Sequence, residues 1–268
     1  MYAMELPYRR IYPTDLTDEQ WRIIRSLLPP SPPTGADRTV NMRRIVDGIL
    51  YVCRTGCQWR MLPKEYEHWN TTYGYFSQWR RDGTWERIHN LLREDVRKKE
   101  RRDPTPSAAI IDSQSVKTTE HKGDRGYDAG KKVKGRKRHI LVDTIGLILA
   151  IVVHPADIQD RDGAKLVFKK VKGAYPRLSL VWADGGYTGP LVDWVMETFG
   201  WDLEIIKPTS AEPGFHVRPW CWIVERTFGW LTKHRRFARD YELTTSSSEA
   251  LILIAMIRNM ACRLARSV

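Results

Sequence analysis

The chain has 268 residues, a formal net charge of +12 and 42% hydrophobic residues, a hydrophobic content that is normal for a globular protein and too high for a disordered one. No apolar run approaches the ~18 residues that a membrane span needs, and the first ten residues lack the apolar segment of a signal peptide. We therefore expect a cytoplasmic protein without a membrane partner. A basic excess of this size favours an anionic partner, most commonly nucleic acid, over a surface that serves solubility alone.

Residues 1–103 have the pattern of a small all-helical domain rich in arginine and aromatic residues. Thr17 and Gln20 have the spacing of a capping box, which marks the start of a helix. Residues 97–107 combine dense charge with two prolines, which end a helix and resist packing, so we place a domain boundary after residue 103. The predicted helices cover residues 17–28, 40–54 and 70–81, and a fourth begins near residue 84.

From residue 104 to 268 the pattern changes to strands alternating with helices. Two of the strands flank Thr144-Ile145-Gly146 and are predicted to form a hairpin. The order of elements fits an α/β domain with a mixed sheet flanked by helices. The predicted strands cover 108–116, 139–143, 147–153, 178–183 and 203–206, and the predicted helices cover 162–172, 190–199, 220–239 and 249–266.

Two aspartates stand at the ends of predicted apolar strands. Asp112 follows Ile110-Ile111, and Asp184 follows Val181-Trp182-Ala183 and precedes two glycines that allow a close turn. A buried carboxylate is costly unless it is paired or bound to a metal. Ligands of open α/β sheets gather beyond the carboxyl ends of strands, so these aspartates would face one another if their strands are neighbours. The alternative is that each aspartate only caps a turn.

Glu225 is the third candidate acid, on the predicted helix 220–239. Its neighbours three and four residues away include no basic side chain, so an ion pair within the helix is unavailable. Three carboxylates suit Mg²⁺, with Mn²⁺ as a second possibility, because these cations prefer oxygen ligands and phosphates can replace their waters. We therefore predict Asp112, Asp184 and Glu225 as catalytic metal ligands. The alternative for Glu225 is an exposed surface residue.

Residues 120–138 contain eight basic and three acidic side chains with several glycines, which predicts a flexible cationic loop close to Asp112. Phosphate contact is a better interpretation of this density than a merely solvated loop. The predicted DNA-contacting residues of this loop are Lys131, Lys132, Lys134, Arg136, Lys137 and Arg138.

Two further groups of residues are predicted to contact DNA. Lys233, Arg235 and Arg236 continue the helix of Glu225, and Arg236 would return to the face of Glu225 after three turns. In the helical domain, the helix 70–81 is our candidate for a reading helix of helix-turn-helix type. Gln78, Arg80 and Arg81 would be its exposed polar side chains, although the helix could equally be a core element.

At this point the residues match a known family: almost the whole chain resembles bacterial transposases of the insertion sequence 5 family. The matching motifs, in order, are LTDEQWRIIRSLLPP, YVCRTGCQWRMLP, FSQWRRDGTWERI, IIDSQSVKT, ADGGYTG, VERTFGWL and RNMACRLAR. The resemblance implies a ribonuclease-H-like catalytic fold with Asp112, Asp184 and Glu225 as its acidic triad. The chain departs from related transposases at Cys221, where an arginine is expected one turn before the glutamate.

The resemblance implies a DNA transposase that acts on double-stranded DNA, both element ends and target. Such an enzyme binds the terminal inverted repeats, hydrolyses a phosphodiester to free a 3′-hydroxyl and joins that end to target DNA. We expect a homodimer on DNA, associated with the nucleoid. Two alternatives remain open: a related nuclease that cuts without joining, and a non-catalytic DNA-binding protein that keeps the fold.

Overall fold

The computed structural model describes residues 9–31, 38–120, 123–206 and 220–266. The helical part begins with Thr17, whose side chain accepts from the amide of Gln20 at 3.3 Å while the Gln20 side chain accepts from the amide of Thr17 at 3.1 Å, so the predicted capping box is confirmed. The third helix begins one residue before the predicted segment 70–81, and its N-cap is His68, whose side chain accepts from the amide of Asn70. The helices of this part are α1 (Asp18–Arg25), α2 (Met42–Thr55), α3 (Trp69–Arg81) and α4 (Thr84–Lys99), with a short 3-10 turn η1 (Trp59–Met61).

The remainder of the described chain forms a six-stranded mixed sheet with the strand order β2-β3-β1-β5-β6, in which β4 also pairs with β3. Strand β1 runs antiparallel to β3 and parallel to β5, and β5 runs parallel to β6. The predicted hairpin is confirmed as β3–β4. The strands are β1 (Ala108–Lys117), β2 (Gly126–Asp128), β3 (Val133–Asp143), β4 (Ile148–Pro155), β5 (Leu180–Ala183) and β6 (Asp202–Ile205).

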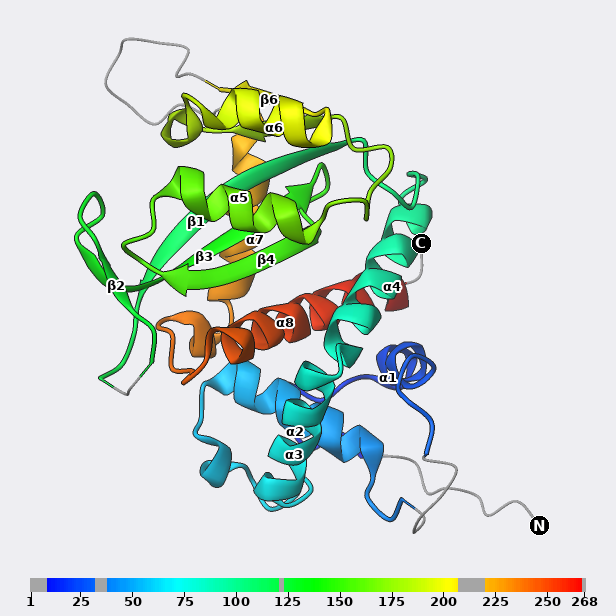
Figure 1. Ribbon diagram of the computed structural model, residues 1–268. Coiled ribbons are helices and arrows are strands. Elements are labelled where there is room, and N and C mark those ends of the chain that lie inside the picture. The colour runs from blue at the N-terminus through cyan, green and yellow to red at the C-terminus, as the bar shows by residue number, and fades with distance from the viewer. Residues whose placement is uncertain (1–8, 32–37, 121–122, 207–219, 267–268) are drawn as a thin grey trace.

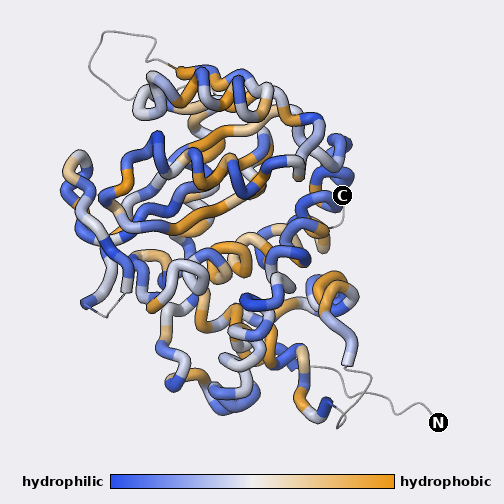
Figure 2. Tube along the Cα trace, in the orientation of Figure 1, coloured by the Kyte–Doolittle hydropathy of each residue, from blue (hydrophilic) through white to orange (hydrophobic). Residues whose placement is uncertain are grey.

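Helices cover both faces of the sheet, because the side chains of each strand alternate between the two faces. Helices α5 (Asp160–Lys170) and α6 (Leu191–Phe199) cover one face, where Ile111 packs with Phe168. Helices α7 (Cys221–Thr232) and α8 (Thr245–Ala265) cover the other, where Ile110 packs with Val224 (Figure 1). Figure 2 shows the hydrophobic residues concentrated in the strands and the buried helix faces.

The hydrophobic core continues across residue 103. Side chains of α2, α3 and α4 pack in one cluster with α8, which comes from the far end of the chain. A buried ion pair between Arg97 of α4 and Asp143 of β3 also joins the two parts. Our boundary at residue 103 remains a prediction, and the two parts share one packed core.

Helix α7 ends at Thr232, seven residues before the predicted end. The chain then forms a short 3-10 turn, η3 (Arg235–Phe237), and changes direction toward α8. Within the described ranges, no helix is both long and apolar enough to cross a lipid bilayer.

Candidate active site

Asp112 and Asp184 lie side by side at the same level of two neighbouring strands. The parallel register of β1 and β5 pairs Ile110 with Trp182. Asp112 lies two residues after Ile110, within β1, and Asp184 lies two residues after Trp182, just beyond the end of β5. Gly186 donates its amide to Asp184 at 2.9 Å, and Ser113 donates its amide to Asp112 at 2.6 Å. The sheet topology thus provides the neighbouring strands that the sequence interpretation required.

The surroundings of Asp112 favour its protonated form. Burial raises the pKa of Asp112 to about 7, and the nearby carboxylates of Asp184 and Asp160 add to the rise, whereas the amide of Ser113 and the amine of Lys131 oppose it. In the described part of the chain, no basic group lies within ion-pair distance of Asp112. A partly buried carboxylate beside like charges is a place where a cation would be strongly stabilised.

Asp160, at the start of α5, is a carboxylate of this region that the sequence interpretation missed. It accepts from the Ser113 hydroxyl at 2.8 Å and pairs with Lys137 at 3.0 Å. Burial would raise the pKa of Asp160, but these two hydrogen bonds outweigh burial and lower it. We predicted that α5 begins at residue 162, so Asp160 was left in a loop. Its position between a strand and a helix was the only sequence signal.

A buried chain of polar rings supports the turn that follows Asp184. The Tyr187 hydroxyl lies 2.7 Å from Nε2 of His139, and Nδ1 of His139 lies 3.2 Å from Nε2 of His154. Burial lowers the pKa of His139 to about 3 and raises that of Tyr187, so both side chains are uncharged. Tyr187 belongs to the ADGGYTG motif, and its anchoring fixes the backbone that carries Asp184.

Glu225 is exposed on α7, and the structure does not bring its carboxylate into a cluster with the two aspartates. Among the described residues, no three His, Cys, Asp or Glu side chains are grouped closely enough to hold a metal ion. Helix α7 nevertheless covers the face of the sheet to which Asp112 points, because Asp112 shares that face with Ile110. Trp220, just before α7, stacks on Trp182 with ring centroids 4.9 Å apart, which places the start of α7 beside β5.

The predicted cationic loop 120–138 is largely strand in its described residues, with a turn at residues 129–132. Residues 126–128 and 133–138 form strands β2 and β3, and Arg136 and Arg138 are each 1% exposed. Arg136 donates to the carbonyls of Asp124, Glu242 and Leu243, and Arg138 donates to those of Phe237 and Arg239. Arg136 and Arg138 therefore do not lie on the exposed surface that their predicted DNA contacts require, because both faces of β3 are covered from residue 135 to 143.

Lys137 is also buried, and its amine binds the Ile158 carbonyl at 2.9 Å as well as Asp160. Lys137 therefore does not lie on the predicted DNA-binding surface, and its amine instead holds Asp160 beside β1. Lys131, Lys132 and Lys134 remain exposed, and the Lys131 amine lies 3.1 Å from the carbonyl of Ser113. These three lysines form the cationic tip of a second hairpin, β2–β3, and this hairpin tip lies directly beside β1, the strand of Asp112.

The two other groups of predicted DNA contacts, one after α7 and one on α3, also contain both exposed residues and residues bonded within the protein. Arg236 is buried and bonded to Glu242 at 2.7 Å, so it does not continue the face of Glu225, whereas Lys233 and Arg235 are exposed. On α3, the Arg80 guanidinium binds the Ser246 hydroxyl at 2.6 Å at the start of α8. Arg80 is therefore half-buried and engaged within the protein, less free than predicted. Gln78 and Arg81 are exposed as expected.

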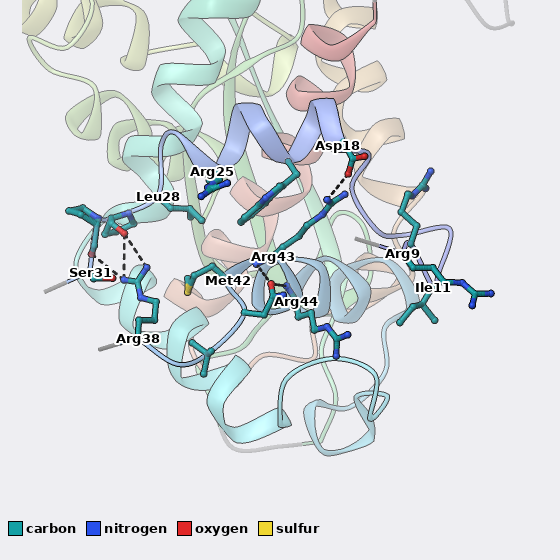
Figure 3. A pocket seen from close by; sticks show the side chains of 16 residues that line it. Arg9, Ile11, Asp18, Arg25, Leu28, Ser31, Arg38, Met42, Arg43 and Arg44 are labelled. Carbon is teal, nitrogen blue, oxygen red and sulfur yellow. Dashed lines mark hydrogen bonds and ion pairs between the residues drawn. The ribbon is translucent and has the colours of Figure 1, made fainter. Parts of the chain in front are cut away.

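The helical part contains an arginine-lined hollow of about 1360 Å³ that the sequence interpretation did not identify (Figure 3). Arg43 is bonded to Asp18 at 2.6 Å and to the carbonyl of Leu16, which fixes α1 against α2. Figure 3 shows that Arg9 and Arg44 extend from different segments of the rim. The arginines that line the hollow are Arg9, Arg10, Arg25, Arg38, Arg43 and Arg44.

The mixed sheet, the aspartates at the same level of two adjacent strands and the covering helices define a ribonuclease-H-like polynucleotidyl transferase. The sequence placed Asp112 at the end of an apolar strand, but it lies within β1, which continues to Lys117. Residues 103–260 match the family model described as "Transposase DDE domain", and residues 16–89 match "Putative transposase of IS4/5 family". The chain belongs to the DDE transposase family, whose catalytic domains use divalent metal ions, typically Mg²⁺.

A curated relative supports the same assignment. The chain is 34% identical over 124 residues to "Insertion element IS402 uncharacterized 16.2 kDa protein" of Burkholderia cepacia. The match covers 44% of this chain and 78% of that protein. The predicted family and fold class are thus confirmed.

Proposed function

We propose that the protein binds the terminal inverted repeats of its element, hydrolyses a phosphodiester there to free a 3′-hydroxyl, and joins that hydroxyl to target DNA. The observation that carries this proposal is the pair of aspartates at the same level of adjacent strands, Asp112 and Asp184, with the cationic hairpin tip beside β1. Phosphoryl transfer depends mainly on positioning and on neutralising charge, and these residues supply both kinds of group.

The donor set fits a divalent cation. Asp112 is partly buried, its pKa is raised, and its nearest charged neighbours include two carboxylates, so the oxygens present are those that Mg²⁺ or Mn²⁺ prefers. Asp112 and Asp184 would hold the ion, and Glu225 is the proposed third ligand. When bound, such an ion activates the attacking oxygen and stabilises the leaving one.

The remaining residues of the site would orient the carboxylates and the DNA. Tyr187, anchored on His139, holds the Asp184 turn, and Ser113 links β1 to Asp160. Lys137 offsets the charge of Asp160, which limits the negative charge near Asp112. The exposed lysines 131, 132 and 134 would bind the DNA backbone.

The helical part would bind the element ends. Gln78 and Arg81 project from α3, and the arginine-lined hollow adds a concave cationic surface. Outside the helical part, Lys233 and Arg235 are exposed after α7 and would contact the DNA backbone. Arginine suits phosphate contact because its guanidinium can form two parallel hydrogen bonds. We propose that two copies of the chain act together, one on each end; the mass of the complex with end DNA in light scattering tests this.

A strand-transfer assay tests the proposed activity. A DNA duplex with the labelled 3′-end of the element is incubated with the protein, Mg²⁺ and a target plasmid. Labelled plasmid is the expected product. Cleaved but unjoined DNA would favour the related nuclease, and intact DNA with a retained mobility shift would favour a non-catalytic DNA-binding protein.

A further inference from the structure

A second cationic pocket lies away from the carboxylates, between α7, α8, the end of α2 and the β3–β4 turn. Its volume is about 850 Å³, and neither Asp112 nor Asp184 lines it. Thr144 and Ile145 form one wall of the pocket. They directly follow Asp143, which pairs with Ala109 near the start of β1, so this wall lies at the end of the sheet where β1 begins. Six basic side chains line the pocket: Arg54, Arg226, Lys233, Arg258, Arg263 and Arg266.

The charge of this pocket exceeds what the fold itself requires. Glu100 is the one carboxylate among the described residues that line it, and it pairs with Arg263 at 2.9 Å, which leaves an excess of five positive charges. Four helices, α2, α4, α7 and α8, end at the pocket, and each C-terminus carries about half a negative charge. These helix ends offset about two charges, so roughly three remain for an external anion.

Several groups in the pocket are held in place without being neutralised. The guanidinium of Arg226 lies between the rings of Trp222 and Trp230, 4.6 and 5.0 Å from their centroids, and donates to the carbonyl of Ile145. Arg258 donates to the carbonyl of Thr14. Carbonyl oxygens and aromatic rings orient a guanidinium and leave its full charge available to a ligand.

An independent observation points to a ligand. His234 lines the pocket and is only 8% exposed; its ring lies near the carbonyls of Trp230 and Leu231, yet neither ring nitrogen completes a hydrogen bond of good geometry with a described residue. The side-chain oxygen of Asn259 and Nε of Arg226, which also line the pocket, are buried and unpartnered as well. Buried polar groups are nearly always hydrogen-bonded, so these atoms require polar partners, which water supplies in the free protein and the oxygens of an anionic ligand would supply on binding.

We propose that this pocket binds the phosphate backbone of a DNA strand at a position separate from the carboxylates. The volume is too large for one phosphate and suits several consecutive ones. Glu225 and Arg226 are successive residues of α7 and therefore lie roughly 100° apart around the helix. Glu225 itself does not line the pocket, so the pocket and the proposed third metal ligand occupy different sides of α7. This inference rests on the proposed function, since DNA is the substrate in both.

The test uses Arg54→Gln, Lys233→Gln and Arg266→Gln together, because these three side chains are exposed and form no ion pair within the described residues. DNA affinity of the full chain is measured against salt, with specific and random duplexes. We expect weaker binding to both duplexes and a flattening of the log affinity against log salt slope by up to about three, near one for each lost contact. Thermal unfolding checks that the variant is folded.

The matched control removes the same charge elsewhere, with Lys64→Gln, Lys169→Gln and Lys172→Gln, all exposed and outside the pocket. Its salt slope should change by less than half as much. If the pocket variant binds DNA with the same affinity and salt slope as the wild-type chain, the pocket proposal is overturned. The proposed function is unaffected by that result, because the wild-type chain still binds DNA. Loss of inorganic tripolyphosphate binding with unchanged DNA binding also overturns it, because the pocket would then bind a free anion. Failure of the wild-type chain to bind any DNA would instead contradict the proposed function.

Discussion

Two acidic residues of the same strand pair, Asp143 and Asp112, have opposite surroundings. Asp143 is fully buried, is paired with Arg97, and accepts from the backbone amides of Ile145 and Leu147 at 3.0 and 2.8 Å. Asp112 lies three residues beyond the register partner of Asp143, accepts one amide hydrogen bond, and has carboxylates as neighbours.

The difference shows that one buried carboxylate, Asp143, stabilises the fold, whereas the other, Asp112, is left available to bind a cation. A buried carboxylate with a complete set of partners costs little and holds elements together. A carboxylate without a cationic partner carries an unfavourable charge, and a bound cation would relieve it. The same division recurs among the cations, where buried Arg138 donates from two nitrogens to carbonyls, and Lys131 reaches toward the carboxylate region from an exposed position.

Replacing Asp112 with asparagine should have the largest effect on activity. The change removes a proposed metal-ligand charge and keeps the size of the side chain, so the cleavage rate should fall by about a thousandfold, equivalent to several kcal/mol of transition-state stabilisation. DNA affinity and unfolding free energy should stay close to the wild type. Cleavage of labelled end DNA and a mobility shift give the two readouts, and wild-type cleavage by the variant would refute the role.

Replacing Asp143 with asparagine should reverse this pattern. The Arg97 charge would be left buried without its partner, which costs about 3 to 5 kcal/mol of unfolding free energy. Urea unfolding measures this loss. At a temperature where the variant is folded, its cleavage rate should remain within about tenfold of the wild type, a difference worth roughly 1.4 kcal/mol. A stable variant without cleavage activity would erase the contrast between the two aspartates.

Replacing Arg138 with methionine should affect stability alone. Burial lowers the pKa of Arg138 to about 10, and the two carbonyls that it serves would lose their donor. Because a hydrogen bond to a charged group is worth roughly 1.5 to 3 kcal/mol, we expect a loss of about 3 kcal/mol in urea unfolding. The salt dependence of DNA binding should not change. A flatter slope of log affinity against log salt would mean that Arg138 contacts DNA.

Replacing Lys131, Lys132 and Lys134 together with glutamine should affect DNA binding alone. Phosphate contacts carry no sequence information, so affinity for specific and random DNA should fall by similar factors. The slope of log affinity against log salt should flatten by up to about three. Unchanged affinity and slope would show that the hairpin tip is only a solvated surface.

The sequence predicted the elements of the fold well where local patterns decide them. The capping box at Thr17 and the turn at residues 144–146 depend on neighbouring residues, and both are present. The approximate positions of β1 and β5 followed from apolar runs. The ends of elements that depend on distant contacts were less predictable: β3 begins at Val133 because it pairs with β1 and β2 along its length.

Charge was the harder property to interpret. A basic run in the sequence cannot show which side chains point inward, and strand alternation sends Arg136 and Arg138 to carbonyls contributed by residues about a hundred positions away. The same limit explains Arg236 and Arg80, whose partners also come from other elements. Asp112 and Asp184 were found because each follows a short apolar run, whereas Asp160 has no such local pattern.

The central claim, that the Asp112 carboxylate contacts the catalytic metal ion, is tested most directly by Asp112→Cys. Mn²⁺ accepts a sulfur ligand more readily than Mg²⁺ does, so cleavage of end DNA should be lost in Mg²⁺ and partly restored in Mn²⁺. Asp112→Ala, which offers no ligand, should be inactive in both. Cleavage by Asp112→Cys at the wild-type rate in Mg²⁺ would contradict the account.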